Sequence, residues 1–533
     1  MTLTPTQTHP GRPGGTGCPG RAGCPGGAGC PGGAAKPLLR EATRTTRHAI
    51  CRFTALLLSC SPAVAAQPNT TALAPAAARA TELLQVLREE ARFPAVSAAV
   101  AIDDRIVWSD AAGFADIEAH APAHPDTVYR LASISKAITG VAVASLVEDG
   151  VLDLDAPLST YLPDYPTAAD AITVRMLMGH TSGTRSYTDE ERDDLAPRQR
   201  DTVEEALEMF AADDLVHEPG ERFTYTTLGY VPVRAVIEKI TGQDFMDVIR
   251  ERVLEPARMQ RTFKDDNKTI IPNRASFYTL HDDGRLINGP YINTSYKPAG
   301  GGMVGTAPDL CRLALALADG TLLSPPARHE LWKPTLDNAG EEIDYGLGWG
   351  LATDPRDKPY VIQIGGQIGT ASAVMLYPDE RVASSIIGNR ASAPTGRAEV
   401  VALSRLFMDT LAGVSAEQPD LPEGVYDVTI TNNDLKWRGA LILTTDRGAA
   451  RGLIAVENTE NPDDRRTFRV ATATSSRDNG FRLFTVHPRW GVFPFDCQTN
   501  GDSSSDTITA TLDRAEDDPW KLTATRMTPD QSQ

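Results

Sequence analysis

The spacing of apolar residues changes near residue 418, and this change divides the chain into two parts with different folds. Before it, helical and strand-like periodicities follow one another, as in a mixed α+β domain. After the Pro-containing linker 417–424, short alternating runs are separated by turn residues, as in an all-β sandwich or barrel. A chain of 533 residues also exceeds one ordinary domain. We therefore predict a leader over 1–66, an α+β domain over 67–417 and a small β-sandwich or barrel over 418–533.

The expected elements follow from the same periodicities. Helical spacing covers residues 79–90, 134–147, 202–212, 228–241 and 307–317. Strands are expected in the first domain over 95–102, 105–109, 361–364, 371–377 and 382–387. The C-terminal part should hold seven strands, over 425–430, 440–445, 452–457, 468–473, 481–486, 507–512 and 521–526.

The first 66 residues show two patterns that are foreign to a folded domain. Residues 1–37 contain Gly-Cys-Pro-Gly repeats, whose composition cannot offset the entropy lost on ordering. Basic residues then precede a short apolar run that ends in Ala-Val-Ala-Ala66, as in a secretory signal peptide. We expect a signal peptide over 40–66, export to the periplasm or the outside, and a start of synthesis downstream of Met1. The run is too short for a transmembrane span, and a lipoprotein box at 57–60 is the second interpretation.

Charge and cysteine content exclude several classes of partner. Removing the seven basic residues and one acidic residue of 1–66 from totals of 52 and 70 leaves the mature part with a net charge of −24. Such an acidic surface argues against binding nucleic acid or anionic membranes. Only Cys311 and Cys497 lie outside the leader, either as half-buried free thiols or as one bridge. No metal-ligand spacing is present, and we expect neither a metal nor a cofactor.

Ser133-Ile-Ser-Lys136 begins the apolar helix expected over 134–147. A spacing of three residues places Ser133 and Lys136 on one helix face, within reach of each other. Burial and the positive helix terminus both disfavour the ammonium form of Lys136, which lowers its pKa. A neutral lysine can take the proton of a neighbouring hydroxyl and so activate a nucleophile. The alternative interpretation is a polar helix start beside an exposed lysine.

A second segment, Glu218-Pro-Gly-Glu-Arg-Phe-Thr-Tyr225-Thr-Thr227, precedes the helix expected from residue 228. Tyr225 should lie just before that helix, where a phenolate is stabilised by the N-terminal dipole. A tyrosine in this place is otherwise a packing residue.

These two segments, about ninety residues apart, resemble the serine beta-lactamase and penicillin-binding-protein superfamily. The likeness is strongest to its class C and esterase branch, and within that branch to mitochondrial serine beta-lactamase-like proteins. It extends over roughly residues 80–410, through further motifs that include Val128–Lys136, Leu152-Asp-Leu-Asp-Ala-Pro, Ile172–Gly183, Asn293–Asp309 and Tyr345-Gly-Leu-Gly-Trp-Gly350.

The resemblance implies a fold and a set of catalytic roles. The fold is an antiparallel sheet flanked by helices, with a helical lobe and the active site between the two. Ser133 becomes the nucleophile, Lys136 its partner and Tyr225 a second proton carrier. The backbone N–H groups of Ser133 and Gly366 form the oxyanion hole.

Two substrate-binding positions depart from the family pattern. Thr227 stands where the second motif usually has Asn, and Gln363 stands where the third motif usually has a cation. A neutral amide attracts a substrate carboxylate less than a lysine does. We therefore expect a poor beta-lactamase. His180 is expected to be structural, and whether Lys297 reaches the cleft remains open.

The sequence predicts a serine hydrolase that forms an acyl-enzyme with a small ester or a peptide or amide. The alternative is a catalytically weak extracytoplasmic binding or structural module of the same fold. Self-assembly stays open, because it rests on analogy alone.

Overall fold

The computed structural model describes residues 71–193, 198–354, 356–391, 396–432, 435–446, 449–476, 480–488, 491–499, 507–512 and 520–527. The predicted signal segment 40–66, the Gly-Cys-Pro repeats and the 57–60 box lie outside these residues. The domain boundaries at 66 and 417 remain predictions. Among the described residues, no helix combines the length and apolar character needed to cross a membrane.

A seven-stranded antiparallel sheet forms the centre of the α+β domain, in the order β11-β12-β13-β14-β1-β2-β3. Its strands are β1 Ala95–Ile102, β2 Arg105–Asp116, β3 Ala121–Pro122, β11 Gly350–Thr353, β12 Pro359–Gln367, β13 Thr370–Tyr377 and β14 Val382–Gly388. Every residue of β1, β13 and β14 is buried, which explains their near-continuous apolar sequences. The expected hairpin of β1 and β2 and the expected strands of 361–387 are confirmed.

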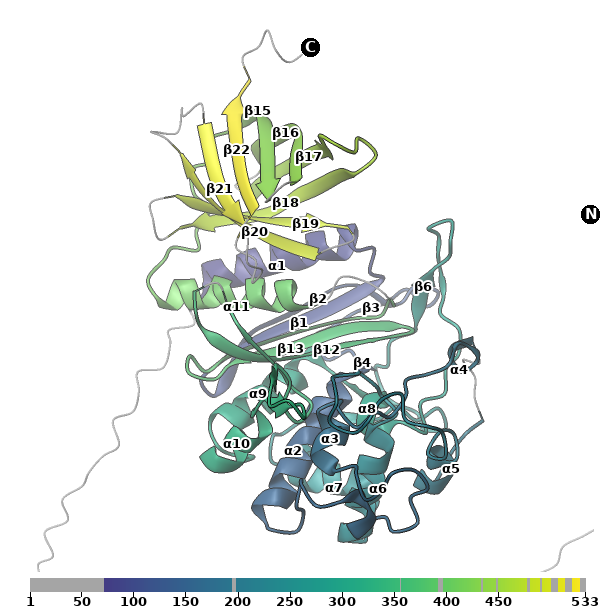
Figure 1. The fold of residues 1–533 in the computed structure, drawn as a ribbon. Coiled ribbons are helices and arrows are strands. Elements are labelled where there is room, and N and C mark those ends of the chain that lie inside the picture. The colour runs from purple at the N-terminus through teal and green to yellow at the C-terminus, as the bar shows by residue number, and fades with distance from the viewer. Residues whose placement is uncertain are drawn as a thin grey trace, which may run out of the picture. The chain divides into compact units, whose positions relative to one another are not determined.

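Helices cover both faces of this sheet and build a helical lobe below it (Figure 1). They are α1 Ala74–Glu90, α2 Ile134–Glu148, α3 Val174–Met178, α4 Asp189–Asp193, α5 Val203–Leu207, α6 Tyr230–Thr241, α7 Phe245–Ile249, α8 Pro298–Gly301, α9 Ala307–Ala318, α10 Pro325–Leu331 and α11 Arg397–Leu411, with a 3-10 turn η1 Leu158–Thr160 and a π-helical turn η2 Arg250–Leu254. Helices α1 and α11 pack on one face of the sheet, and α9 packs on the other. The expected helices are present, although the one predicted over 202–212 ends at Leu207.

Three small sheets connect these layers. They consist of β4 Tyr129–Arg130, β8 Met303–Gly305 and β5 Phe263–Lys264; of β9 Thr335–Leu336 and β10 Glu342–Ile343; and of β6 Tyr278–Leu280 and β7 Leu286–Asn288. Strand β4 enters directly into the start of α2. Pairing of Arg130 with Val304 of β8 therefore helps to fix the point at which that helix begins.

The C-terminal part is a closed antiparallel barrel of eight strands, in which β22 pairs back to β15. The strands are β15 Gly424–Asn432, β16 Leu435–Asp446, β17 Ala449–Asn458, β18 Arg465–Ser475, β19 Phe481–His487, β20 Gly491–Thr499, β21 Thr507–Leu512 and β22 Trp520–Arg526. Seven of them were predicted. The eighth, β20, contains Pro494, which argues against a strand in a sequence pattern. Large buried side chains fill the interior, where Trp437 stacks on Trp520 with ring centroids 4.9 Å apart.

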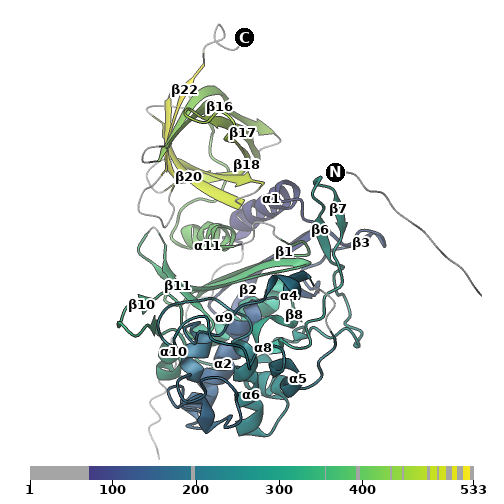
Figure 2. The same ribbon diagram turned by 45° about the vertical axis from the view of Figure 1, so that its right-hand side comes forward.

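The barrel shares a hydrophobic cluster with the helices on the outer face of the sheet. Residues 66–533 form one unit, and α1 and α11 lie between the sheet and the barrel (Figures 1 and 2). Phe484, Val486 and Val492 of the barrel belong to the same buried cluster as residues of these two helices. At the edge of this contact, Arg482 of β19 forms an ion pair with Asp409 of α11 at 2.6 Å.

The two cysteines of the described residues are both free thiols. Cys311 and Cys497 are fully enclosed, at 0% and 2% exposure, so the expectation of half-buried thiols is corrected. Burial raises the pKa of Cys311 to about 12, so its thiol is inert at neutral pH.

Candidate active site

Ser133 is the N-cap residue of α2, but its side chain does not cap the helix. By contrast, the N-cap threonines of α3, α5 and α9 each accept a backbone N–H bond. Ala132, directly before Ser133, has a left-handed backbone with a φ of 48°, which is strained for a residue with a Cβ. The turn thus leaves the Ser133 hydroxyl available to other groups.

Lys136 lies one turn further along α2 and is completely buried. Its Nζ donates to Ser133 Oγ at 3.1 Å, to Thr227 Oγ1 at 3.2 Å and to the Gly300 carbonyl at 2.7 Å. No carboxylate of the described residues pairs with it. Burial lowers the pKa of Lys136 to about 7, so a large fraction of the amine is neutral at physiological pH.

Tyr225 lies in the loop before α6, with its ring facing the start of α2. Its ring centroid is 4.9 Å from Lys136 Nζ and 4.2 Å from the His180 ring centroid. Tyr225 is 41% exposed as a whole residue, yet burial of its phenol raises the pKa, and hydrogen bonds with Ser133 and Gln363 only partly oppose this. Helix α6 begins at Tyr230, so Tyr225 lies too far from its N-terminus for the expected phenolate stabilisation. Tyr225 is a neutral phenol at neutral pH.

Thr227 connects Lys136 to two further aromatic side chains, Tyr187 and Tyr296. Its hydroxyl accepts from Lys136, and a hydrogen bond also joins it to Tyr187. The Tyr187 hydroxyl is in turn 3.1 Å from that of Tyr296. Thr227 therefore lies inside the site, packed against Gly300, and the two residues together hold the Lys136 amine.

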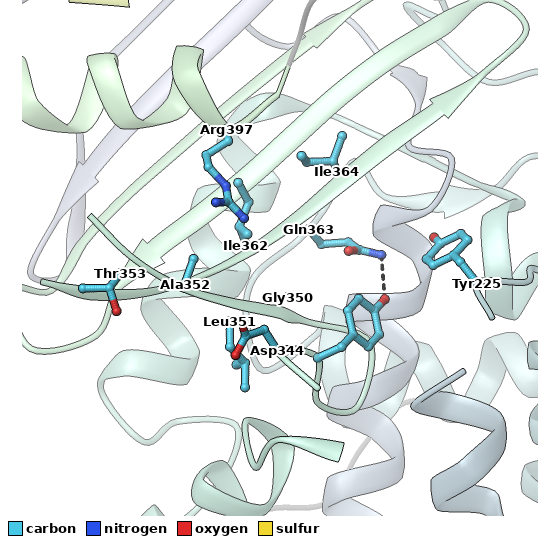
Figure 3. A pocket seen from close by; sticks show the side chains of 11 residues that line it. Tyr225, Asp344, Gly350, Leu351, Ala352, Thr353, Ile362, Gln363, Ile364 and Arg397 are labelled. Atoms are coloured by element: carbon cyan, nitrogen blue, oxygen red, sulfur yellow. Dashed lines mark hydrogen bonds between the residues drawn. The ribbon is translucent and has the colours of Figure 1, made fainter. Parts of the chain in front are cut away.

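Gln363 is buried at 5% exposure, and its amide nitrogen is already engaged. Nε2 donates to the Ser133 carbonyl at 3.0 Å and to the Tyr345 hydroxyl at 3.1 Å. In Figure 3 the dashed line from the Gln363 amide marks its hydrogen bond to the Tyr345 hydroxyl, and the Tyr225 ring lies nearby. The side chain lines the site and also holds the backbone of Ser133.

Strand β12 passes directly beside Ser133. A Cβ at Gly365 would lie 2.3 Å from the Leu131 carbonyl oxygen and 3.2 Å from Ser133 N, so only glycine fits there. A Cβ at Gly366 would meet no atom within 4 Å. Strand β11 pairs with β12 only up to Ile362. The remaining edge of β12, next to Ser133, has no strand partner among the described residues.

A pocket of about 530 Å³ opens along this edge. Tyr225, Tyr345 and Gln363 line its inner end, and Asp344 and Arg397 extend toward it from opposite sides of β11 (Figure 3). The pocket therefore offers both an anion and a cation beside strands β11 and β12.

Tyr345 and Gly300 are site residues that sequence reasoning did not assign. The signal for Tyr345 was present in Tyr345-Gly-Leu-Gly-Trp-Gly350. A Cβ at Gly348 would lie 2.3 Å from the Lys136 carbonyl oxygen, so this loop packs backbone to backbone against α2 and carries Tyr345 into the site. The Gly300 carbonyl gives no such signal, because backbone acceptors leave no trace in a side-chain pattern.

His180 is buried among aromatic side chains, as expected for a structural histidine. Its Nδ1 accepts from the Thr226 N–H at 3.3 Å, and its ring packs on Tyr225, Tyr230 and Tyr345. Burial holds the pKa of His180 well below its usual value, so the ring is neutral. No group of three or more His, Cys, Asp or Glu side chains within the described ranges could hold a metal ion.

Comparison with known proteins agrees with this geometry. The beta-lactamase family model matches residues 80–406. The mitochondrial serine beta-lactamase-like protein LACTB of Homo sapiens is 27% identical over 412 residues, which cover 60% of this chain and 75% of the human protein. Penicillin-binding protein 4* of Bacillus subtilis is 26% identical over 322 residues, covering 58% and 70% of the two chains.

Solved structures extend the likeness to the fold. An octameric penicillin-binding protein homologue from Pyrococcus abyssi matches with a TM-score of 0.53 and 22% identity, over 82% of this chain and 97% of its own. A D-stereospecific amidohydrolase from Streptomyces sp. matches with a TM-score of 0.54 and 23% identity, over 62% of this chain and 98% of its own. From its sequence match and its fold, the chain belongs to the beta-lactamase family of serine hydrolases, which also includes penicillin-binding-protein homologues.

Proposed function

We propose that the protein hydrolyses a small ester or a peptide or amide through an acyl-enzyme on Ser133. The observation that carries this proposal is the buried amine of Lys136, 3.1 Å from Ser133 Oγ, with a pKa lowered to about 7. A lysine of ordinary pKa would be protonated and could not accept the hydroxyl proton.

In the acylation step, neutral Lys136 takes the proton of the Ser133 hydroxyl as Oγ attacks the substrate carbonyl carbon. The carbonyl π electrons move onto oxygen, and the N–H groups of Ser133 and Gly366 stabilise this oxyanion. When the intermediate collapses, the bond to the leaving group breaks and Tyr225 donates a proton to that group. The raised pKa of Tyr225 suits a donor, and the lowered pKa of Lys136 suits an acceptor. Lys136 then returns its proton to the Tyr225 phenolate.

In the deacylation step, water replaces the leaving group. The water molecule loses one proton to the neutral amine of Lys136 as its oxygen attacks the ester carbonyl of the acyl-enzyme. The bond to Ser133 Oγ breaks, Oγ regains a proton, and the free acid leaves. The open edge of β12 provides space for the substrate backbone beside Ser133.

The nature of the scissile bond is part of the proposal. Solved neighbours carry the titles D-amino acid amidase from Ochrobactrum anthropi and a hydrolase with promiscuous acyltransferase activity. These titles support acyl transfer from an amide or an ester. The Gln363 side chain carries no positive charge, and its amide nitrogen already donates to Ser133 and Tyr345. It therefore offers little to the carboxylate of a beta-lactam, which supports weak beta-lactamase activity.

The test is labelling with a fluorophosphonate probe followed by peptide mass spectrometry. We expect one adduct, on Ser133, and its complete loss in Ser133→Ala with an unchanged circular dichroism spectrum. Ser135 is the matched neighbour: its buried Oγ accepts the Met303 N–H at 3.2 Å and should stay unlabelled. Absence of labelling in the wild-type protein would favour the binding or structural module instead.

We also propose that residues 40–66 direct export, and that the protein assembles with itself. The second proposal is supported only by the octameric state named for the Pyrococcus abyssi homologue, whose match covers more of this chain than the α+β domain alone.

A further inference from the structure

Lys297 is a second lysine of the cleft, and the proposed chemistry does not use it. It immediately precedes α8, and its Nζ donates to Gln367 Oε1 at 3.0 Å. Its side chain runs toward the nucleophile. A Cβ built on Gly301 would lie 3.7 Å from Lys297 Cδ, 3.8 Å from Thr227 Cγ2 and 3.9 Å from the carbonyl carbon of Ala132.

Among the described residues Lys297 has aromatic neighbours but no anionic partner, and its Nζ lies 5.8 Å from the Tyr187 ring centroid and 5.6 Å from the Tyr296 ring centroid. No carboxylate of the described residues forms an ion pair with it. Burial, reinforced by the positive charges of Lys136 and Arg130, lowers the pKa of Lys297 to about 7, and Asp265 opposes this only weakly. Asp265 is itself paired with Arg130 at 2.9 Å and with Arg274. The local field is therefore positive and favours an anion.

Gln367 adds a second donor that has no acceptor. Its Oε1 receives the Lys297 proton, which directs its amide nitrogen away from the lysine. That nitrogen is buried and donates to no group in the described part of the chain. An unsatisfied buried donor costs free energy unless a ligand supplies the acceptor.

The register of β12 places this pair relative to the nucleophile. Every second residue of a strand points to the same face, so one face of β12 carries Gln363, Gly365 and Gln367. Gln363 contacts the Ser133 carbonyl, and Gln367 lies four residues further along the strand. Two residues of extended strand separate Gly365 from Gln367, which is about 7 Å. Gln367 directly follows Gly366, whose N–H belongs to the proposed oxyanion hole, so the donors lie on the part of β12 that continues past this hole.

We propose that Lys297 and Gln367 form a subsite that binds a carboxylate on the acyl part of the substrate, next to the proposed oxyanion hole. Every available group of the subsite is a donor, which selects an anionic acceptor over an amide or an ammonium group. The proposal rests on the proposed function and narrows its substrates to acyl groups with a distal carboxylate. It also explains how a chain with Gln363 in place of a cation still recognises an anion.

The test compares two esters that differ only in the distal charge, p-nitrophenyl monoadipate and p-nitrophenyl methyl adipate, at pH 7. After correction for their alkaline hydrolysis rates, wild-type kcat/KM should favour the anionic ester by on the order of tenfold to a hundredfold, as for a charge-assisted hydrogen bond. In Lys297→Met this ratio should fall to about one, and Lys297→Arg should restore part of it. Lys239→Met, on the exposed side of α6, is the matched control and should keep the wild-type ratio.

Calorimetry with monomethyl adipate, which needs no reactive serine, separates failure of the subsite from failure of the proposed function. Binding that weakens about tenfold or more in Lys297→Met supports the subsite even when Ser133 takes no fluorophosphonate label, and in that case only the proposed function is overturned. The subsite proposal is overturned if the wild-type protein hydrolyses the anionic and the neutral ester with equal kcat/KM. It is also overturned if the wild-type protein and Lys297→Met show the same ester ratio or the same affinity for monomethyl adipate. Labelling of Ser133 under those same conditions leaves the acyl-enzyme proposal standing.

Discussion

Lys136 illustrates how a single side chain is adapted to a task by what surrounds it. Three oxygen acceptors hold its amine, and none of them carries a charge. Hydrogen bonds to neutral acceptors orient the amine, but they offset only part of the burial cost of its charged form. A carboxylate in place of the Gly300 carbonyl would hold the proton on Lys136 and prevent its proposed use as a base.

The rate of acylation should therefore depend on the protonation of Lys136. We expect kcat/KM for the neutral ester p-nitrophenyl methyl adipate to rise with pH and to level off above about 7, because only the unprotonated amine accepts the Ser133 proton. The measurement is a profile of initial rates from pH 5.5 to 9, corrected for spontaneous hydrolysis. A rate that still rose in proportion to hydroxide at pH 9 would contradict a lowered pKa at Lys136.

The sequence predicted the contact between Ser133 and Lys136 better than the surroundings of these two residues. Ser133 and Lys136 share one helix turn, so their contact follows from local spacing alone. The bonding of Gln363 could not be predicted, because it depends on Tyr345, which a separate loop carries to the amide. The opposite pKa shift of Tyr225 has the same origin, since burial by distant segments outweighs the local helix terminus.

At the scale of elements, the N-terminus of α11 connects the pocket with the barrel. Glu399 is buried at 3% exposure, and its two carboxylate oxygens accept different backbone N–H groups. One comes from Gly396 at the helix start, at 2.7 Å, and the other from Val492 of β20, at 3.0 Å. Arg397, which lines the pocket, lies between Gly396 and Glu399 in the sequence.

Replacing Glu399 should destabilise the protein more than replacing an exposed glutamate. Glu399→Ala leaves the buried Val492 N–H and the half-buried Gly396 N–H without their acceptors, and we expect a loss of roughly 2–4 kcal/mol in the free energy of unfolding. Urea denaturation followed by circular dichroism measures it. The control is Glu204→Ala, on the exposed side of α5, which should stay within about 0.5 kcal/mol of wild type. Equal stability of the two variants would mean that Glu399 does not connect the two elements.

Elements with a strong period were predictable, whereas those defined by tertiary contacts were not. The buried helix α2 and the strands β13 and β14 follow from their apolar patterns. Strand β20 was missed because Pro494 lacks an N–H, and only the neighbouring strands of the closed barrel define its place in the sheet. Closure, which distinguishes a barrel from a sandwich, is also a long-range property, because it depends on the pairing of β15 with β22.

At the scale of the whole molecule, the proposed export of the protein makes a prediction about its mature start. If residues 40–66 are a signal peptide, the purified extracytoplasmic protein should begin near Ala66 or Gln67. N-terminal sequencing of material from a fractionated cell measures this. A cytoplasmic protein that retains the Gly-Cys-Pro repeats would contradict both the cleavage and the compartment.

The shared cluster of the barrel and the two outer helices has a consequence for comparing relatives. Phe484, Val486 and Val492 complete the burial of α1 and α11. A relative that lacks the barrel would expose these apolar faces to water unless polar residues replaced them. The helix sequences alone should therefore reveal whether a family member carries a barrel. Apolar residues on both sides of the first and last helices mark a chain with one, and an ordinary amphipathic stripe marks a chain without it.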